Sequence, residues 1–146
     1  MTSPDGSSAE AGWQPALRTL TSPKDANHQG SVFGGAILSL IDQAGYVEAR
    51  RHGIHRWVTV ALEAVKFHEP VWMGDLVTLY TRTSRAGTTS VTVQVRVDAQ
   101  RYTTAATVRV TEATITLVST DERGQPIPFR SPPSMPVAQA HPMGGA

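Results

Sequence analysis

The chain has 146 residues, 40% of them hydrophobic and 17% charged, with a formal net charge of +1. Such a composition is ordinary for one soluble globular domain, and the lack of a basic stripe argues against a nucleic-acid partner. There is no cysteine, which excludes disulfides, thiol catalysis and zinc sites built on sulfur. The apolar runs are too short for a membrane span, and the first residues lack the basic and apolar regions of a signal peptide. We therefore expect a cytoplasmic protein without a membrane partner.

The two ends of the chain differ in composition from the middle. Residues 1–14 are rich in Ser, Pro, Gly and Ala, and residues 129–146 are rich in Pro and small residues. Neither end has the apolar periodicity that a packed element requires. We predict two flexible tails around a single domain that spans residues 15–128.

The predicted domain begins with a short strand over residues 15–20 and a turn over residues 21–27, where Pro, Asp and Asn favour tight backbone conformations. A long helix over residues 34–52 follows and is apolar on most sides. Gly53 then stands where a left-handed C-cap is favoured, directly after basic residues that complement the negative end of the helix dipole.

Beyond the helix the apolar pattern changes to a period of two, which is typical of strands. The strands are predicted over residues 57–68, 76–85, 88–98 and 107–119. Sequential strands joined by short turns form an antiparallel sheet, and a helix that is apolar nearly all round must be enclosed by that sheet. The predicted fold class is therefore α+β, with a long central helix wrapped by a curved antiparallel β-sheet.

One carboxylate, Asp42, interrupts the apolar helix. Burying an unpaired charge is costly, so an acid at this position needs a reason. One interpretation is catalysis, because a partly desolvated carboxylate is a better general base than a free one. The other is a buried acid that is satisfied by backbone donors or by a symmetry-related partner.

Gly34 and Gly35 precede the apolar run and would begin the helix. Free amides at a helix start can hold a developing oxyanion, although the glycines could serve only to permit a tight turn. Asp42 lies about 10 Å further along the helix axis at 1.5 Å per residue. A carbonyl held at the helix start would more easily meet an acid from a neighbouring copy, and the hypothesis is a composite site across a two-fold interface.

An ordered set of motifs extends over residues 17–128. The set comprises Arg18-Thr-Leu20, Asn27 with Gly30, Val32-Phe-Gly-Gly35 followed by Asp42, Val58-Thr-Val60 with Glu63, Phe67, Pro70-Val71, Gly74-Asp75, Gly87-Thr-Thr-Ser90, Thr111-Glu-Ala113, and Asp121 with Gly124. It resembles the acyl-CoA thioesterases of the hot-dog fold, in the branch of bacterial short- and medium-chain acyl-CoA hydrolases and the mammalian brain acyl-CoA hydrolase. The chain departs from that family at Ala36, where a large aromatic is frequent, and at Ala64, where a glycine is frequent. Both departures could reshape an acyl pocket.

The resemblance implies hydrolysis of acyl-CoA thioesters to a carboxylic acid and coenzyme A, without a further cofactor. It implies that Asp42 acts as general base or as nucleophile, that Gly35 helps to stabilise the oxyanion, and that Asn27 positions the thioester carbonyl or the water. Asn27 could equally be only a turn residue. The resemblance also implies a homodimer and hexamers built as a trimer of dimers.

Substrate contacts are expected at Phe33, Gly34 and Thr59, although Thr59 could be no more than a residue that favours strands. The phosphates of coenzyme A require cationic or amide donors. The candidates for that role are Lys66, Arg82, Arg85, Gly87, Thr88, Thr89 and Ser90. Each basic residue taken alone could instead belong to a solvated strand face.

Other chemistries lack their signatures. The histidines have no metal-ligand spacing and we expect no metal site, and no G-x-S-x-G elbow is present. Two alternatives remain open. A hydratase or dehydratase of acyl thioesters would need a His working with an acid, and no His lies on the helix before His52. A non-catalytic acyl-CoA-binding protein is the second alternative.

Overall fold

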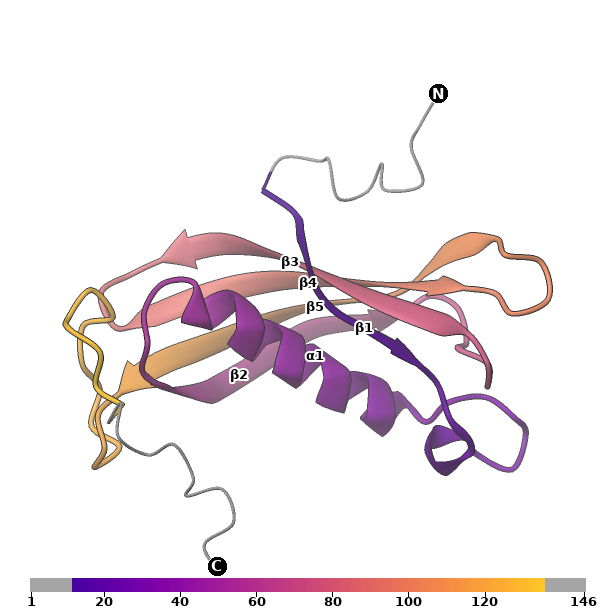
Figure 1. Cartoon of the computed structure of the whole chain (residues 1–146), viewed down its shortest axis with the longest axis horizontal. Helices are drawn as coiled ribbons and strands as arrows, with labels where there is room; N and C mark the ends of the chain where they lie inside the picture. Colours follow the sequence, from indigo (N-terminus) through magenta and orange to yellow (C-terminus); the bar gives the residue numbers. More distant parts are fainter. Residues whose placement is uncertain (1–11, 136–146) are drawn as a thin grey trace, which may run out of the picture.

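Five strands and one long helix make up residues 12–135, the part of the chain that the computed structural model describes (Figure 1). In chain order the elements are β1 (Gln14–Leu20), the 3₁₀ helix η1 (Pro23–Asp25), α1 (Gly34–Arg50), β2 (Arg56–Phe67), β3 (Leu76–Ala86), β4 (Ser90–Gln100) and β5 (Thr107–Thr120). The strands form one antiparallel sheet in the order β1-β3-β4-β5-β2. The predicted α+β architecture is confirmed, and every boundary of α1 and of the five strands lies within two residues of its prediction.

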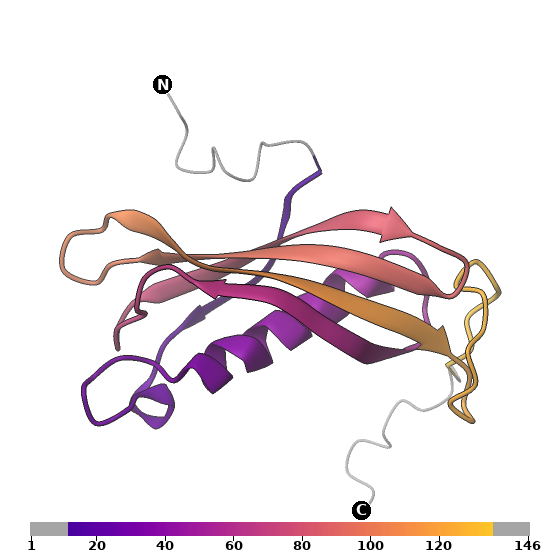
Figure 2. The same ribbon diagram turned by 180° about the vertical axis from the view of Figure 1, so that it is seen from behind.

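The period-two pattern decides which face of the sheet meets the helix. On β4 the alternate residues Val91, Val93, Val95 and Val97 are buried, while the residues between them are only partly buried. The buried valines belong to one hydrophobic core together with Ile37 and Ile41 of α1. The helix therefore lies across one face of the sheet, and Figures 1 and 2 show it from the two sides.

The helix is more amphipathic than its sequence suggested. Its buried residues are Ile37, Ile41, Ala44, Gly45, Glu48 and Ala49. Asp42 and Tyr46 lie on the exposed side, so the prediction of a helix that the chain encloses nearly all round is wrong for a single chain. At Gly45 the helix approaches β5 so closely that an added Cβ would lie 2.8 Å from Ile115 Cγ2. No helix within residues 12–135 is long and apolar enough to cross a membrane.

Gly53 does not form the predicted left-handed C-cap. The helix ends at Arg50, and its C-cap residue Arg51 keeps a right-handed helical conformation. Gly53 does not have a positive φ. Its role is steric instead, because a Cβ at Gly53 would lie 2.5 Å from the carbonyl oxygen of Phe129 and 2.8 Å from His55 Cδ2. The glycine allows a later segment of the chain to pack against the end of the helix.

That later segment, residues 126–135, is called the C-terminal strap below. The amides of Ile127, Phe129 and Ser134 bond to backbone carbonyls of the body, and Phe129 is only 3% exposed. The Pro-rich composition of this part of the chain predicted a flexible tail from residue 129. For residues 129–135 that prediction is wrong, because the strap is hydrogen-bonded to the body. Trp13 is likewise buried inside the predicted N-terminal tail. The rest of the predicted tails, residues 1–11 and 136–146, lies outside the described residues.

Candidate active site

Asp42 meets Thr59 where α1 passes the edge strand β2. The Thr59 hydroxyl donates a hydrogen bond of 2.5 Å to Asp42 Oδ1, and both residues are exposed in the single chain. The acid that looked misplaced in an apolar helix is thus on the open side of that helix. Thr59 fixes one carboxylate oxygen and leaves the other facing solvent or a ligand.

The Asp42–Thr59 pair borders a cavity of about 370 Å³, called the Asp42 cavity below. Its other lining residues are Leu17, Gln43, Tyr46, Val47, Trp57 and Leu117. Most of these side chains are apolar, and the carboxylate stands at the edge. An apolar cavity with a few placed polar groups is the usual form of a small-molecule site.

The start of α1 offers unpaired amides. The amides of Ala36 and Ile37 bond to the Phe33 carbonyl, whereas those of Gly34 and Gly35 donate to no other described residue. A Cβ added at Gly35 would meet nothing within 4 Å, so packing inside this chain does not require a glycine there. Free amides at a helix N-terminus can stabilise a developing oxyanion.

A second hollow of about 300 Å³ lies beside this helix start, and Gly34, Phe67 and Thr111 are among its lining residues. The Thr111 hydroxyl is the single buried side-chain polar atom without a hydrogen-bond partner among residues 12–135. A buried unpaired hydroxyl carries a desolvation cost. From the sequence, Thr111 was named only as part of the family resemblance and not as a site residue, because a threonine on a strand is usually only a residue that favours strands.

Asn27 uses its side chain within its own turn. Its Oδ1 accepts hydrogen bonds from the amides of Gln29 and Ser31 at 2.8 and 3.3 Å, and its Nδ2 donates to the Ser31 hydroxyl at 2.8 Å. In the single chain Asn27 therefore makes no hydrogen bond with Asp42 or Thr59. Asn27 shapes the loop that leads into the helix. Within one chain it therefore acts as a turn residue, the second of the two roles that the sequence left open.

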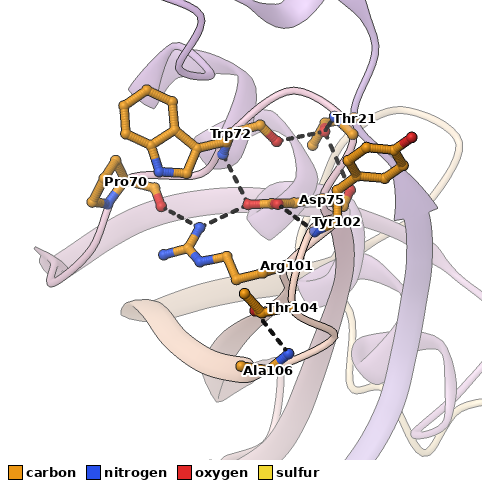
Figure 3. A network of polar contacts seen from close by, with 9 residues as sticks. Thr21, Pro70, Trp72, Asp75, Arg101, Tyr102, Thr104 and Ala106 are labelled. Carbon is orange, nitrogen blue, oxygen red and sulfur yellow. Dashed lines mark hydrogen bonds and ion pairs between the residues drawn. The ribbon is translucent and has the colours of Figure 1, made fainter.

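A buried ion pair holds the neighbouring loop (Figure 3). Asp75 is 2% exposed and accepts hydrogen bonds from Arg101 Nη1 at 2.7 Å and from the amides of Trp72 and Tyr102 at 2.9 and 3.3 Å. The same Arg101 nitrogen also donates to the Pro70 carbonyl at 2.8 Å. The carboxylate thus ties residues 70–75 to the turn after β4.

The loop held by Asp75 in turn carries the segment before the helix. The amide of Val32 donates to the Val71 carbonyl at 2.7 Å, and the amide of Met73 donates to the Gly30 carbonyl at 3.2 Å. Asp75 therefore positions the helix start without touching it. In the sequence Gly74-Asp75 was named only as part of the family resemblance, and nothing there linked Asp75 to Arg101.

Within one chain the two halves of the predicted site remain apart. The Asp42 cavity and the hollow beside Gly34 share no lining residue. Asp42 lies seven positions after Gly35 on α1, about 10 Å along the axis. The structure brings Asp42 and Thr59 together but leaves Asn27 and Gly35 at the other end of the helix.

The predicted coenzyme A contacts do not gather into one group either. Lys66 and Arg82 line a hollow on the sheet face turned away from α1, together with Trp13 and Arg96. The Arg82 and Arg96 guanidinium carbons lie 4.8 and 4.1 Å from the centroid of the Trp13 ring. Asp42 of the same chain is on the opposite face.

The remaining contacts lie in and beside the turn between β3 and β4. Gly87 and Ser90 close this turn through a backbone hydrogen bond of 2.8 Å, and Arg85 beside it is exposed. The carbonyl of Thr88 accepts from the amide of Phe129, and that of Thr89 accepts from the β5 residue Ser119. The turn therefore belongs to the end of the sheet that carries the C-terminal strap.

The acid that α1 does bury is Glu48. Its carboxylate accepts hydrogen bonds from the hydroxyls of Thr83 at 2.7 Å and Thr81 at 3.0 Å, and it pairs with Arg51. Burial by itself raises the pKa of Glu48, but the bonds from Thr83, Thr81 and Arg51 and the Arg51 charge together outweigh it and leave the pKa below its ordinary value. All its near partners are structural, so Glu48 supports the fold.

Residues 29–116, more than half of the chain, match the family model described as the thioesterase superfamily. The chain belongs to the thioesterase superfamily. A Zymomonas mobilis protein described as an uncharacterized acyl-CoA thioester hydrolase is 35% identical over 113 residues, which cover 77% of this chain and 76% of the relative. The acyl-CoA thioester hydrolase YciA of Escherichia coli strain K12 is 37% identical over 119 residues, with coverage of 75% and 86%.

Solved thioesterase structures share the fold. A hexameric hotdog-fold thioesterase of Campylobacter jejuni superposes with a TM-score of 0.75 at 39% identity, covering 80% of this chain and 90% of that one. A hexameric broad-specificity acyl-coenzyme A thioesterase, in a variant with one aspartate changed to alanine, superposes with a TM-score of 0.76 at 32% identity. The match covers 80% of this chain and 86% of that one. The predicted hot-dog fold is thereby confirmed.

Two departures from the family pattern lie away from the Asp42 cavity. Ala64 sits at a bulge of β2 with φ of 52°, a left-handed conformation that favours glycine, and it lines the outer hollow with Lys66. Ala36 lines a separate hollow between α1 and the segment after β1. Within one chain neither residue lines the Asp42 cavity, and their effect on an acyl pocket stays a prediction.

Proposed function

We propose that this protein hydrolyses acyl-CoA thioesters to a carboxylic acid and coenzyme A. The observation that carries the proposal is the hydrogen-bonded Asp42–Thr59 pair at the edge of an apolar cavity, in a chain of the thioesterase superfamily. An apolar wall suits an acyl chain, and a carboxylate beside it suits water activation. The named relatives are acyl-CoA thioester hydrolases.

In the proposed site Asp42 and Thr59 of one subunit face the helix start of a partner copy. The partner's glycine amides would hold the thioester carbonyl oxygen, and the partner's asparagine turn would position that carbonyl. Asp42 would take a proton from water as the water oxygen attacks the carbonyl carbon. The tetrahedral intermediate would then expel the coenzyme A thiolate, which takes up the proton.

The second route has Asp42 attack the carbonyl directly and form a mixed anhydride that water then hydrolyses. A single turnover in ¹⁸O-labelled water identifies the nucleophile route if label enters the protein; attack of water on the acyl carbon of the anhydride would label only the released acid, as the general-base route does. General-base catalysis puts the label in the released acid and none in the protein. In the nucleophile route, label enters the Asp42 carboxylate when water attacks the aspartyl carbon of the anhydride.

Thr59 would act as a positioning residue by holding one Asp42 oxygen. Solved structures of the Staphylococcus aureus acyl-CoA hydrolase, 25% identical to this chain, include variants in which an asparagine or a threonine is changed to alanine. Together with the aspartate variant described above, these are the residue types of Asn27, Thr59 and Asp42. That agreement supports the assignment of roles.

Self-association would complete the site. The edge strand β2 exposes Val58, Val60, Leu62 and Phe67, and Phe33 is exposed beside the helix start. Apolar side chains on an open sheet edge favour pairing with a second copy. We propose a homodimer and a hexamer made of three dimers, which is in keeping with the hexameric relatives.

Coenzyme A contacts and location are further parts of the proposal. Because Lys66 and Arg82 lie on the far face from Asp42, they would meet the phosphates of a substrate bound at another subunit's carboxylate. Arg85 and the turn 87–90 are the alternative donors for those phosphates. A cytoplasmic location stays a prediction, which fractionation of cells would test.

Thiol release from a panel of acyl-CoAs tests the reaction. We expect hydrolysis by the wild type and a loss of about 10³-fold or more in kcat for Asp42→Asn, which keeps the shape but removes the base. Wild-type rates from Asp42→Asn would refute the mechanism. Hydration of an enoyl-CoA without thiol release would favour the hydratase alternative, and tight binding without turnover would favour a binding protein.

Subunit mixing tests the shared site. Asp42→Ala and Asn27→Ala chains are each inactive in this scheme, but a mixed dimer holds one intact site. Random exchange of equal amounts makes half of the dimers mixed, so about one quarter of the wild-type sites should return in a two-fold dimer. If exchange is demonstrated by mass and no activity returns, each site lies within one chain.

A further inference from the structure

Trp57 is the largest apolar side chain around the Asp42 cavity and sits on the same strand as Thr59. It is 6% exposed, and its indole Nε1 donates to the Gly53 carbonyl at 3.0 Å. Two residues along a strand correspond to about 7 Å. A carbonyl carbon held at the Asp42–Thr59 pair would thus be only a few carbon atoms away from the indole.

The C-terminal strap closes the space behind Trp57. The ring of Phe129 lies 6.0 Å from the indole, and the His55 ring contacts it edge-on at 6.2 Å. Phe129 is itself held, because its amide donates to the Thr88 carbonyl and its carbonyl accepts from His55 Nε2 at 2.8 Å. Buried on both sides, the indole cannot withdraw from the cavity without displacing the strap.

We propose that Trp57, braced by the C-terminal strap, is the end wall of the acyl pocket and restricts the enzyme to short acyl chains. The inference rests on the proposed hydrolase function. The apolar side of the Asp42 cavity suits the acyl chain, whereas the pantetheine arm, with its polar amides and distant phosphates, leaves through the open side. Trp57 therefore acts on specificity and takes no part in the chemistry.

The test is kcat/KM across acetyl-, butyryl-, hexanoyl-, octanoyl- and decanoyl-CoA. For the wild type, kcat/KM should fall once the acyl chain is longer than a few carbons. In Trp57→Val, which keeps a strand-favouring residue, the ratio of octanoyl to butyryl rates should rise by about 4-fold for each methylene that enters the new space. Two newly buried methylenes give at least about tenfold.

Two further variants keep the test decisive if Trp57→Val does not fold. Trp57→Phe opens less space and should give a smaller rise, and Phe129→Leu should let the indole retreat and also raise the ratio. The matched control is Trp72→Val, which removes an exposed indole outside the cavity and should leave the ratio at its wild-type value.

Each outcome decides a different statement. If the wild type hydrolyses decanoyl-CoA with the same kcat/KM as butyryl-CoA, Trp57 is not the end wall. Folded Trp57 variants that keep the wild-type ratio would show the same. A uniform loss at every chain length places the pantetheine arm against Trp57 and also overturns the end wall. Wild-type protein that releases thiol from none of the acyl-CoAs refutes the proposed function itself.

Discussion

Glu48→Gln removes the charge of the acid that α1 buries while keeping its size. The carboxylate accepts from Thr81, Thr83 and Arg51 in an environment where Glu48 is 6% exposed. The amide of glutamine keeps one acceptor oxygen and turns the other into a donor, toward which the Thr83 hydroxyl would have to turn its acceptor side. The loss of one charge-assisted hydrogen bond predicts a cost of about 2 kcal/mol in the free energy of unfolding at neutral pH.

The pH dependence of this cost has a definite sign. The pKa of Glu48 is lowered in the folded protein, while an unfolded glutamate titrates at about 4.3. A lowered folded pKa stabilises the fold fully above the unfolded value, and this contribution is lost as the pH falls through the folded pKa. The difference between wild type and Glu48→Gln should therefore be constant from pH 6 to 8 and shrink below pH 4.

Urea unfolding of both proteins at one fixed protein concentration measures the difference, since association also contributes to stability. Circular dichroism at pH 3.0, 4.0, 5.0 and 7.0 would follow the transition. A difference that is equal at pH 3.0 and pH 7.0, or that grows in acid, would show that the Glu48 charge does not stabilise the fold. Glu63→Gln, on an exposed part of β2, is the matched control and should change little.

Two backbone substitutions test the strained and crowded positions. Ala64→Gly should stabilise the protein by about 1 kcal/mol, because a left-handed conformation costs an L-residue about that much; a lower melting temperature would contradict this. Gly53→Ala should destabilise by about 2 kcal/mol or more and loosen the strap, because its Cβ would lie 2.5 Å from the Phe129 carbonyl; limited proteolysis near residue 130 that stays at the wild-type rate would refute the packing role.

The fold could be predicted because its signals are local. The valines of β4 alternate, the turns carry their own Gly and Pro residues, and the helix has a clear glycine start, so the period of the pattern identifies each element. The exposed side of the helix was not predictable from apolar content alone. The whole helix was predicted to be enclosed, yet Tyr46 is 41% exposed because one chain has only one sheet face to cover the helix.

The site was predicted in part. Asp42 and Thr59 were both candidates and they do meet. Trp57, Thr111 and Arg101 were missed because their importance comes from contacts with residues far away in sequence. The C-terminal strap was misjudged for the same reason, since its composition is that of a loose tail while Phe129 is fixed by the non-local ring contacts and hydrogen bonds that bury it.

The exposure of Asp42 is what connects assembly with chemistry. In a single chain the carboxylate faces solvent next to an unpaired edge strand that exposes apolar side chains. A second copy that covers β2 would remove water from the carboxylate at the same time as it supplies a helix start with two free amides. Water exclusion strengthens every electrostatic contact in such a site. In the proposed assembly an unassociated subunit would hold the acid but lack both the oxyanion donors and the dry surroundings, so the contact that buries the apolar edge would also complete the catalytic site.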